Sequence, residues 1–117
     1  MRTDGIAYRD FVRISDAIEA VRLLSADAGK ADQAAKVFNL SSGKTERLDW
    51  LASEIQRESQ EMLGREIQME TGHEADRFIN PFEVPNDRLR SLGWTPRVSL
   101  KEDIRATLRF FIDESAK

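Results

Sequence analysis

The sequence contains no cysteine and only one histidine, and these two shortages exclude much chemistry. Without cysteine there is no disulfide, no thiolate nucleophile and no zinc–thiolate site. The single histidine, His73, lies between Gly72 and Glu74 with no second histidine in the chain. A solvated loop residue is therefore favoured over a metal ligand, and a Ser-His-Asp triad would rest on this one side chain. We predict no catalytic residue and no metal site.

Long apolar stretches and runs of basic residues are also missing. Lys and Arg form no run longer than two residues, and the 117-residue chain has a formal net charge of −3, so nucleic-acid binding is not expected. No apolar run is long enough to span a bilayer, and no signal peptide is recognisable. With 33% charged and 40% hydrophobic residues, the composition is typical of one soluble domain, which we expect to span residues 1–117 and to be cytoplasmic.

A glycine-rich phosphate loop is missing as well. Residues 43–45 read Gly-Lys-Thr, but a phosphate loop also needs a glycine five residues before the Gly-Lys pair, and Phe38 occupies that position. We therefore interpret residues 43–45 as a turn between a strand and a helix.

Changes in hydrophobic periodicity predict a small α/β domain in which short strands pack with about four helices. Ser99 and Glu102 form a capping box at the start of the last helix, and Asp16 with Glu19 marks the start of the first. Gly64 is placed to end the longest helix. We expect a loop at 25–35, strands at 8–14, 36–40 and 66–70, and helices at 16–25, 45–63, 87–92 and 99–114.

The apolar faces of these helices predict the core. Trp94 follows Gly93 and is placed to pack back onto helix 87–92. The other predicted core residues are Val21, Leu24, Leu48, Leu51, Ile55, Leu92, Ile104, Leu108 and Phe111.

Arg9 and Asp10 stand at the head of the first predicted strand. An arginine at a strand edge is compatible with a surface ion pair or with a planar donor fork for phosphate. The residues alone favour the ion pair.

Three segments together resemble the C-terminal, substrate-binding part of extended short-chain dehydrogenases/reductases, the NAD-dependent epimerase/dehydratase family that acts on nucleotide-activated sugars. Residues 3–16 contain TDG followed by RDFVRISD, similar to the family's "dG…RDFvhVsD". Residues 37–43 (VFNLSSG) are similar to its "vyNvgsG", and residues 88–100 (RLRSLGWTPRVSL) to its "skLrsLGWkPrvsLeeGi". The three occur in the family's order.

The resemblance implies two binding residues. Arg9 occupies the position of the family arginine that helps to hold the nucleotide diphosphate, and Arg77 is the nearest match to a second such arginine. In the family that second arginine is often followed by proline, whereas here the proline comes four residues later, at Pro81. The family's aspartate before the "skLr" helix is replaced by Pro85, which leaves no carboxylate for a ribose or capping contact there.

The resemblance also implies what this chain lacks. Full-length enzymes carry a Rossmann half with a glycine-rich turn for NAD(P) and a Tyr-x-x-x-Lys pair, but this chain has no G-x-x-G-x-x-G, and Tyr8 is followed by Val12 where the lysine would stand. We expect a nucleotide-sugar-binding portion that binds weakly, takes no NAD(P) and is inactive in isolation. The alternative is a stand-alone interaction domain that associates with itself or with a partner such as the missing Rossmann half, through apolar surface that this half would have covered.

Overall fold

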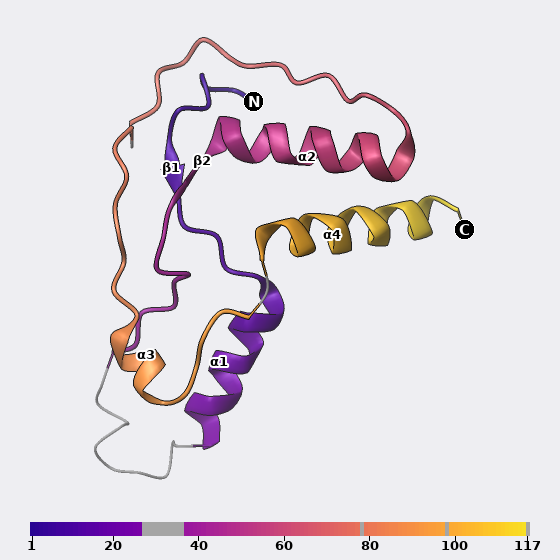
Figure 1. Ribbon diagram of the computed structural model, residues 1–117. Helices are drawn as coiled ribbons and strands as arrows, with labels where there is room; N and C mark the ends of the chain where they lie inside the picture. Colours follow the sequence, from indigo (N-terminus) through magenta and orange to yellow (C-terminus); the bar gives the residue numbers. More distant parts are fainter. Residues whose placement is uncertain (27–36, 78, 98, 117) are drawn as a thin grey trace. The chain divides into compact units, whose positions relative to one another are not determined.

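The computed structural model describes residues 1–26, 37–77, 79–97 and 99–116. Four helices and one two-stranded sheet are the regular elements within these residues (Figure 1), which confirms the predicted small α/β fold. The residues divide into two compact units, each built from separate stretches of the chain. In chain order the elements are β1 (Tyr8–Arg9), α1 (Ile14–Ala26), β2 (Glu46–Arg47), α2 (Leu48–Leu63), α3 (Asp87–Ser91) and α4 (Leu100–Ser115).

The first unit contains the sheet, α2 and α4. β1 pairs antiparallel with β2, so that Arg9 lies opposite Glu46. α2 follows β2 without a break, and the N–H of Leu48 donates to the carbonyl of Ala7 at 2.9 Å. As predicted, Gly64 ends α2 in the left-handed conformation, with φ of 64°. The unit comprises Met1–Arg9, Glu46–Pro81 and Ser99–Lys117.

α4 packs against α2 around a buried carboxylate. Glu58 of α2 is fully buried, and Arg105 of α4 donates from Nε to Glu58 and from Nη2 to Glu61. Ile104, which directly precedes Arg105 in α4, is also buried, as predicted. The capping box of Ser99 and Glu102 is confirmed, with both reciprocal hydrogen bonds formed.

The second unit, Asp10–Thr45 and Phe82–Val98, is organised around Trp94. Trp94 is buried with Leu89 of α3 and Ala20 of α1. The predicted packing of Trp94 onto α3 is therefore confirmed. Its indole Nε1 donates to the backbone carbonyl of Asp16 at 2.8 Å, which satisfies the one polar atom of the buried ring. The partly buried side chains around this core are Val12, Leu23, Leu24 and Phe38.

The predicted strands are mostly wrong. β1 covers only Tyr8–Arg9 of the expected 8–14, and residues 37–40 and 66–70 have no regular structure; residue 36 lies outside the described residues. Alternating polarity alone does not make a strand, because a strand also needs a hydrogen-bonded neighbour. Within the part of the chain that the structure describes, β1 with β2 is the one such ladder. Because β2 takes residues 46 and 47, α2 begins at Leu48 rather than at 45.

The predicted role of Asp16 as a helix cap is also wrong. α1 begins at Ile14, and the N–H of Ala17 already donates to the carbonyl of Arg13 at 3.0 Å. Asp16 therefore falls in the first turn, where it is buried and accepts a hydrogen bond from the N–H of Arg97 at 3.3 Å. An acid in the first turn still interacts favourably with the helix dipole, so the residue type fits the helix start.

Three predicted core residues are exposed. The accessible fraction is 61% for Val21, 36% for Ile55 and 62% for Phe111. In α1 the buried face carries Ala20 and the partly buried Leu24, which are four residues apart, whereas Val21 lies on another face. Small or short side chains such as Ala20 carry a weak hydrophobic signal, so the sequence pattern selected the larger apolar residue next to it.

Candidate functional site

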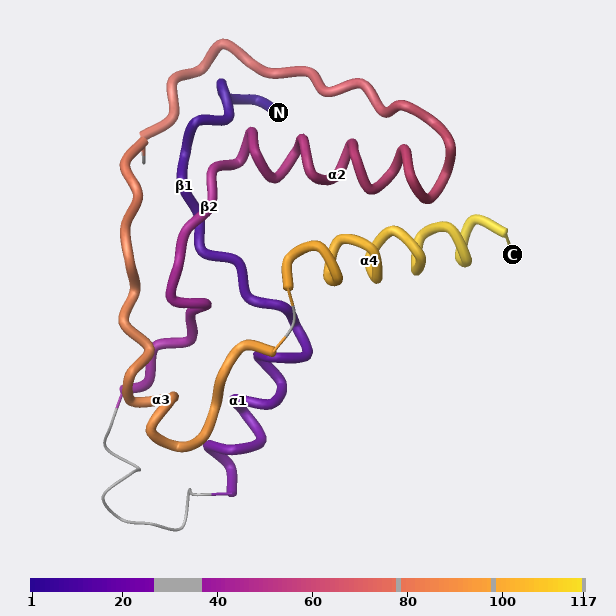
Figure 2. The backbone as a smooth tube through the Cα atoms, in the orientation of Figure 1, coloured from indigo at the N-terminus to yellow at the C-terminus, as the bar shows by residue number. Residues whose placement is uncertain are grey.

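The N-terminal residues run alongside the segment that follows α2 in the first unit (Figure 2). The ammonium of Met1 donates to the carbonyl of Glu70 at 2.5 Å. The N–H of Gly72 donates to the carbonyl of Thr3 at 2.9 Å, and the N–H of Asp4 donates to the carbonyl of Glu74 at 3.0 Å. These backbone hydrogen bonds join two segments that are far apart in the sequence.

Gly72 is the point of closest approach between these two segments. A Cβ atom added to Gly72 would lie 1.5 Å from the carbonyl oxygen of Arg2. No side chain fits at that distance, so the contact requires glycine. Gly72 thereby lets the backbone of Arg2, which lines a pocket, lie against this segment.

A pocket of about 300 Å³ lies where the two segments meet β1. Arg9 reaches it from β1, and Arg77 reaches it from the segment after α2. The two arginines that the family resemblance implies as diphosphate ligands therefore line the same pocket. We refer to it as the arginine pocket; its lining residues are Arg2, Thr3, Arg9, Glu74, Ala75, Asp76 and Arg77.

Asp76 anchors the segment that carries Arg77. Its Oδ2 accepts a hydrogen bond from the N–H of Ala7 at 3.0 Å, in the residues leading into β1. Burial alone would raise the pKa of Asp76, but the hydrogen bonds from the backbone of Ala7 and from the side chain of Thr3 outweigh it and lower the pKa below its ordinary value. The carboxylate is therefore ionised near neutral pH and is used for structure.

The remaining charges of the arginine pocket are arranged around its rim. Arg9 is half-buried, and its Nη1 donates to the carbonyl of Tyr8 at 2.8 Å. Arg2 and Glu74 form an exposed ion pair, with Nε and Oε2 3.2 Å apart. Three guanidinium groups and two carboxylates thus surround the space, for a formal charge of +1. This arrangement is chemically suited to a polyanion such as a diphosphate.

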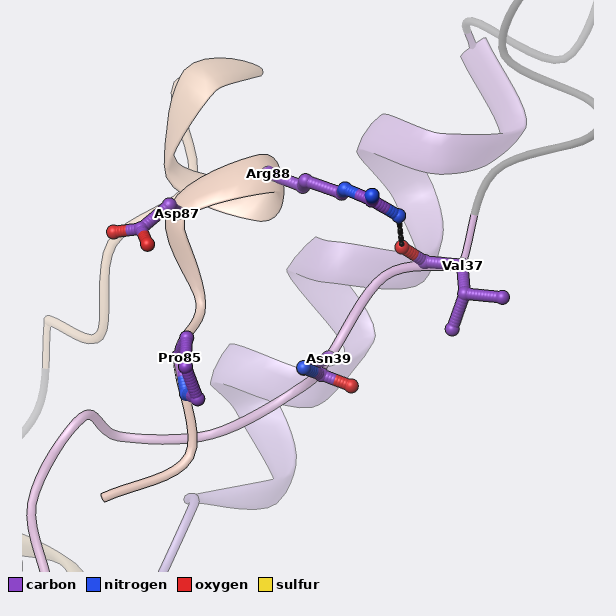
Figure 3. A pocket seen from close by; sticks show the side chains of 5 residues that line it. All are labelled: Val37, Asn39, Pro85, Asp87 and Arg88. Atoms are coloured by element: carbon purple, nitrogen blue, oxygen red, sulfur yellow. Dashed lines mark hydrogen bonds between the residues drawn. The ribbon is translucent and has the colours of Figure 1, made fainter.

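A second pocket, of about 330 Å³, lies in the second unit (Figure 3). Arg88 of α3 reaches across it and donates from Nη1 to the carbonyl of Val37 at 3.0 Å. Asp87 points away from Arg88, and Pro85 offers no hydrogen-bonding side chain here. Because this pocket has one guanidinium and the arginine pocket has three, it is less suited to a diphosphate.

Asp10 has a different role from its neighbour Arg9. Its Oδ1 accepts a hydrogen bond from the N–H of Ser42 at 2.8 Å, which holds the turn at residues 42–45. Gly43 adopts a positive φ of 87° in this turn, and the chain then enters β2 rather than a helix. The predicted turn between a strand and a helix is therefore wrong in both flanking elements: the chain bends at Gly43, but residues 37–40 form no strand and β2 follows before α2. Of these two neighbouring residues, Arg9 lines the arginine pocket and Asp10 holds the turn.

The sequence gives no local signal for three residues of the arginine pocket. Arg2, Glu74 and Asp76 were not predicted, because their proximity depends on backbone hydrogen bonds between distant segments. A glycine in a polar stretch, such as Gly72, was the only sequence feature that could have pointed to a close backbone approach. His73 is exposed, as the interpretation of a solvated loop residue predicts.

Comparisons with known proteins place this geometry in context. No protein-family model and no curated protein matches the chain. Solved structures do match. WbmF from Bordetella bronchiseptica, in complex with NAD+ and UDP, is 26% identical with a TM-score of 0.68, over 97% of this chain and 31% of that chain. UDP-glucose 4-epimerase from Thermotoga maritima, with UDP-glucose, is 23% identical with a TM-score of 0.68, over 98% of this chain and 35% of that chain.

A third match is RMD from Pseudomonas aeruginosa complexed with NADPH, at 24% identity and a TM-score of 0.67, over 92% of this chain and 33% of that chain. The protein has the fold of one part of an NAD-dependent epimerase/dehydratase. The predicted family resemblance is thereby confirmed at the level of fold. The chain spans about a third of the length of the structures that it matches.

The described residues hold neither a membrane-spanning helix nor a cluster of metal ligands. None of the helices there combines the length and the apolar character that crossing a bilayer requires. The same residues contain no group of three or more His, Cys, Asp or Glu side chains placed to hold a metal ion.

Proposed function

We propose that this chain is the nucleotide-sugar-binding part of an NAD-dependent sugar epimerase, dehydratase or reductase, and that it is inactive in isolation. The observation that carries the proposal is the arginine pocket, which is lined by both Arg9 and Arg77. The similar structures support it, because one was solved with UDP and another with UDP-glucose. The diphosphate is the part of the substrate that the pocket would hold.

The chemistry of arginine favours this assignment. A guanidinium binds phosphate through two parallel charge-assisted hydrogen bonds, and the β1–β2 pairing fixes the backbone of Arg9, so less order has to be gained on binding. Arg77 is exposed and remains in contact with water. With only these contacts, we expect a dissociation constant on the order of a millimolar.

A titration with UDP-glucose followed by NMR tests the proposal. We expect the largest chemical-shift changes at Arg9, Arg77 and their neighbours, weaker binding by Arg9→Lys, which keeps the charge but loses the fork, and the weakest by Arg9→Ala. Arg65→Ala is the matched control, because Arg65 is exposed in the same unit and does not line the pocket. If all the proteins titrate alike while Arg9→Ala only melts earlier, Arg9 is structural and the proposal is wrong.

One observation favours the alternative of a self-associating domain. Ile14, Ile18 and Val21 of α1 are exposed at 76%, 63% and 61%, and their spacing of four and three residues puts them on one face of the helix. A contiguous exposed apolar face is typical of an interaction surface. Sedimentation velocity over a range of concentrations tests this alternative: Ile18→Glu should abolish a concentration-dependent dimer, and a wild-type monomer at all concentrations would exclude it.

A further inference from the structure

Arg2 is held in the arginine pocket by the backbone around it. Met1, Thr3 and Asp4 form backbone hydrogen bonds with residues 70–74. Gly72 lets the carbonyl of Arg2 approach this segment closely. The backbone of Arg2 is therefore fixed, whereas its side chain is 85% exposed. Arg2 thus shares a fixed backbone with Arg9, whose backbone is held by the pairing of β1 with β2, and its guanidinium is the more exposed of the two.

The two acids of the arginine pocket are used differently. The carboxylate of Asp76 accepts from the backbone of Ala7 and is tied to the fold. The carboxylate of Glu74, by contrast, contacts Arg2 in an ion pair whose two side chains are both largely exposed. An exposed pair of this kind contributes little net stability, so its arginine can exchange the carboxylate for a stronger anion. A phosphate oxygen pair matches the guanidinium fork at least as well.

We propose that Arg2 is a third phosphate-binding arginine of the arginine pocket, and that Glu74 competes with the ligand for it. In the empty pocket Glu74 holds the guanidinium of Arg2 at the rim. When a nucleoside diphosphate binds to Arg9 and Arg77, Arg2 leaves Glu74 and binds the phosphates. Glu74 therefore lowers the affinity of the site for anions, whereas Arg2 raises it. This inference rests on the proposed function of the same pocket.

Opposite effects of two charge-neutralising substitutions test the proposal. In NMR titrations of the full chain with UDP, we expect Arg2→Gln to weaken binding about three- to tenfold and Glu74→Gln to strengthen it about two- to threefold, as expected for partly exposed charges. Uridine, which lacks the phosphates, should bind all variants equally. Arg2→Lys keeps the charge without the fork and should lie between wild type and Arg2→Gln.

The Arg22–Glu19 ion pair of α1 provides matched controls. It is also largely exposed and lies in the other unit, so Arg22→Gln and Glu19→Gln make the same changes in net charge away from the pocket. If the substitutions at Arg22 and Glu19 change UDP binding as much as those at Arg2 and Glu74, the effect is one of general charge and the proposal is wrong. UDP binding that is unchanged by Arg2→Gln, or weakened by Glu74→Gln, would also overturn it. Failure of wild type to bind UDP at all would instead overturn the proposed function together with this inference.

Discussion

At the scale of single residues, the arginine pocket depends on contacts that hold its segments together. Asp76 holds the segment of Arg77 against Ala7, and Gly72 permits the contact with Arg2. Arg9 is held by the pairing of β1 with β2. The structural roles of Gly72 and Asp76 can be tested by measuring the thermal stability of variants, without any ligand.

Substitution of Gly72 by alanine should separate the N-terminal residues from residues 70–74. The added Cβ would overlap the carbonyl oxygen of Arg2, a backbone atom that cannot rotate away, so the hydrogen bonds on both sides should break. We expect a lower melting temperature and a shifted amide resonance of Asp4, whose N–H donates to the carbonyl of Glu74. The control is Gly64→Ala, whose Cβ meets nothing within 4 Å and which carries only the strain of its positive φ, about 1 kcal/mol. Equal losses in both variants would contradict this account.

Asp76 should make the stability of the first unit depend on pH. Because its pKa is lowered in the folded protein, the unfolded chain binds the proton more readily. The stabilisation is therefore present above the ordinary pKa of 3.8 and is lost as the pH falls through the lowered value. Melting temperatures of wild type and Asp76→Asn should differ at about pH 6 and converge towards about pH 2. Asp113→Asn, at an exposed position on α4, is the control that removes one carboxylate from the same unit.

At the scale of elements, helices were predictable and strands were not. The start of α4 follows from Ser99 and Glu102, and the end of α2 follows from Gly64, because both signals act within one turn of the helix. A strand of the predicted length at 66–70 needed a partner that the local pattern cannot specify. The same reason explains why Arg9 and Arg77 were predicted only through the family resemblance, and why Arg2 and Glu74 were not predicted.

The packing of α4 on α2 should depend strongly on Arg105. Its Nε contacts the fully buried carboxylate of Glu58, whose Oε1 has no hydrogen-bond partner among the described residues. Arg105→Leu would leave this buried charge with only the longer contacts of Arg57 and Lys101, at 3.5 and 3.7 Å, so we expect a loss of about 3 kcal/mol. Arg57, whose Nη2 lies 3.5 Å from Oε1 of Glu58, is 54% exposed, and Arg57→Leu should cost less than about 1 kcal/mol.

Chemical denaturation of these two variants measures the difference. The double substitution Glu58→Leu with Arg105→Leu should recover much of the loss, because an apolar pair can replace a buried ion pair at little cost. Similar losses in Arg105→Leu and Arg57→Leu would show that the buried carboxylate relies on both arginines equally.

At the scale of the whole molecule, the chain accounts for about a third of the structures that it resembles. Two of these are complexes with NAD+ or NADPH. The sheet within the described residues of this chain has two antiparallel strands. The glycines with positive φ lie in separate turns, at positions 5, 43, 64 and 93. Such turns do not build the glycine-rich cradle for a dinucleotide.

We therefore predict that this chain alone neither binds NAD(P) nor turns over a nucleotide sugar. Calorimetric titration with NAD+ and with NADPH should give no saturable heat, and a coupled assay with UDP-glucose should give no product. Saturable NAD+ binding would mean that the fold resemblance assigns the wrong part of the enzyme. Adding back a purified Rossmann portion of a similar enzyme, without its own substrate-binding part, is the matched reconstitution experiment.

The chain passes from one compact unit to the other at four peptide bonds, after Arg9, Thr45, Pro81 and Val98. Neither unit is therefore a continuous stretch that could be excised and expressed alone. Each unit must bring together pieces of chain made early and late in synthesis, and closing such long loops is slow compared with forming a local helix. We infer that each unit completes its fold only after its last segment has been synthesised. The helices can form during synthesis, but the arginine pocket cannot form before residues 74–77 have been made.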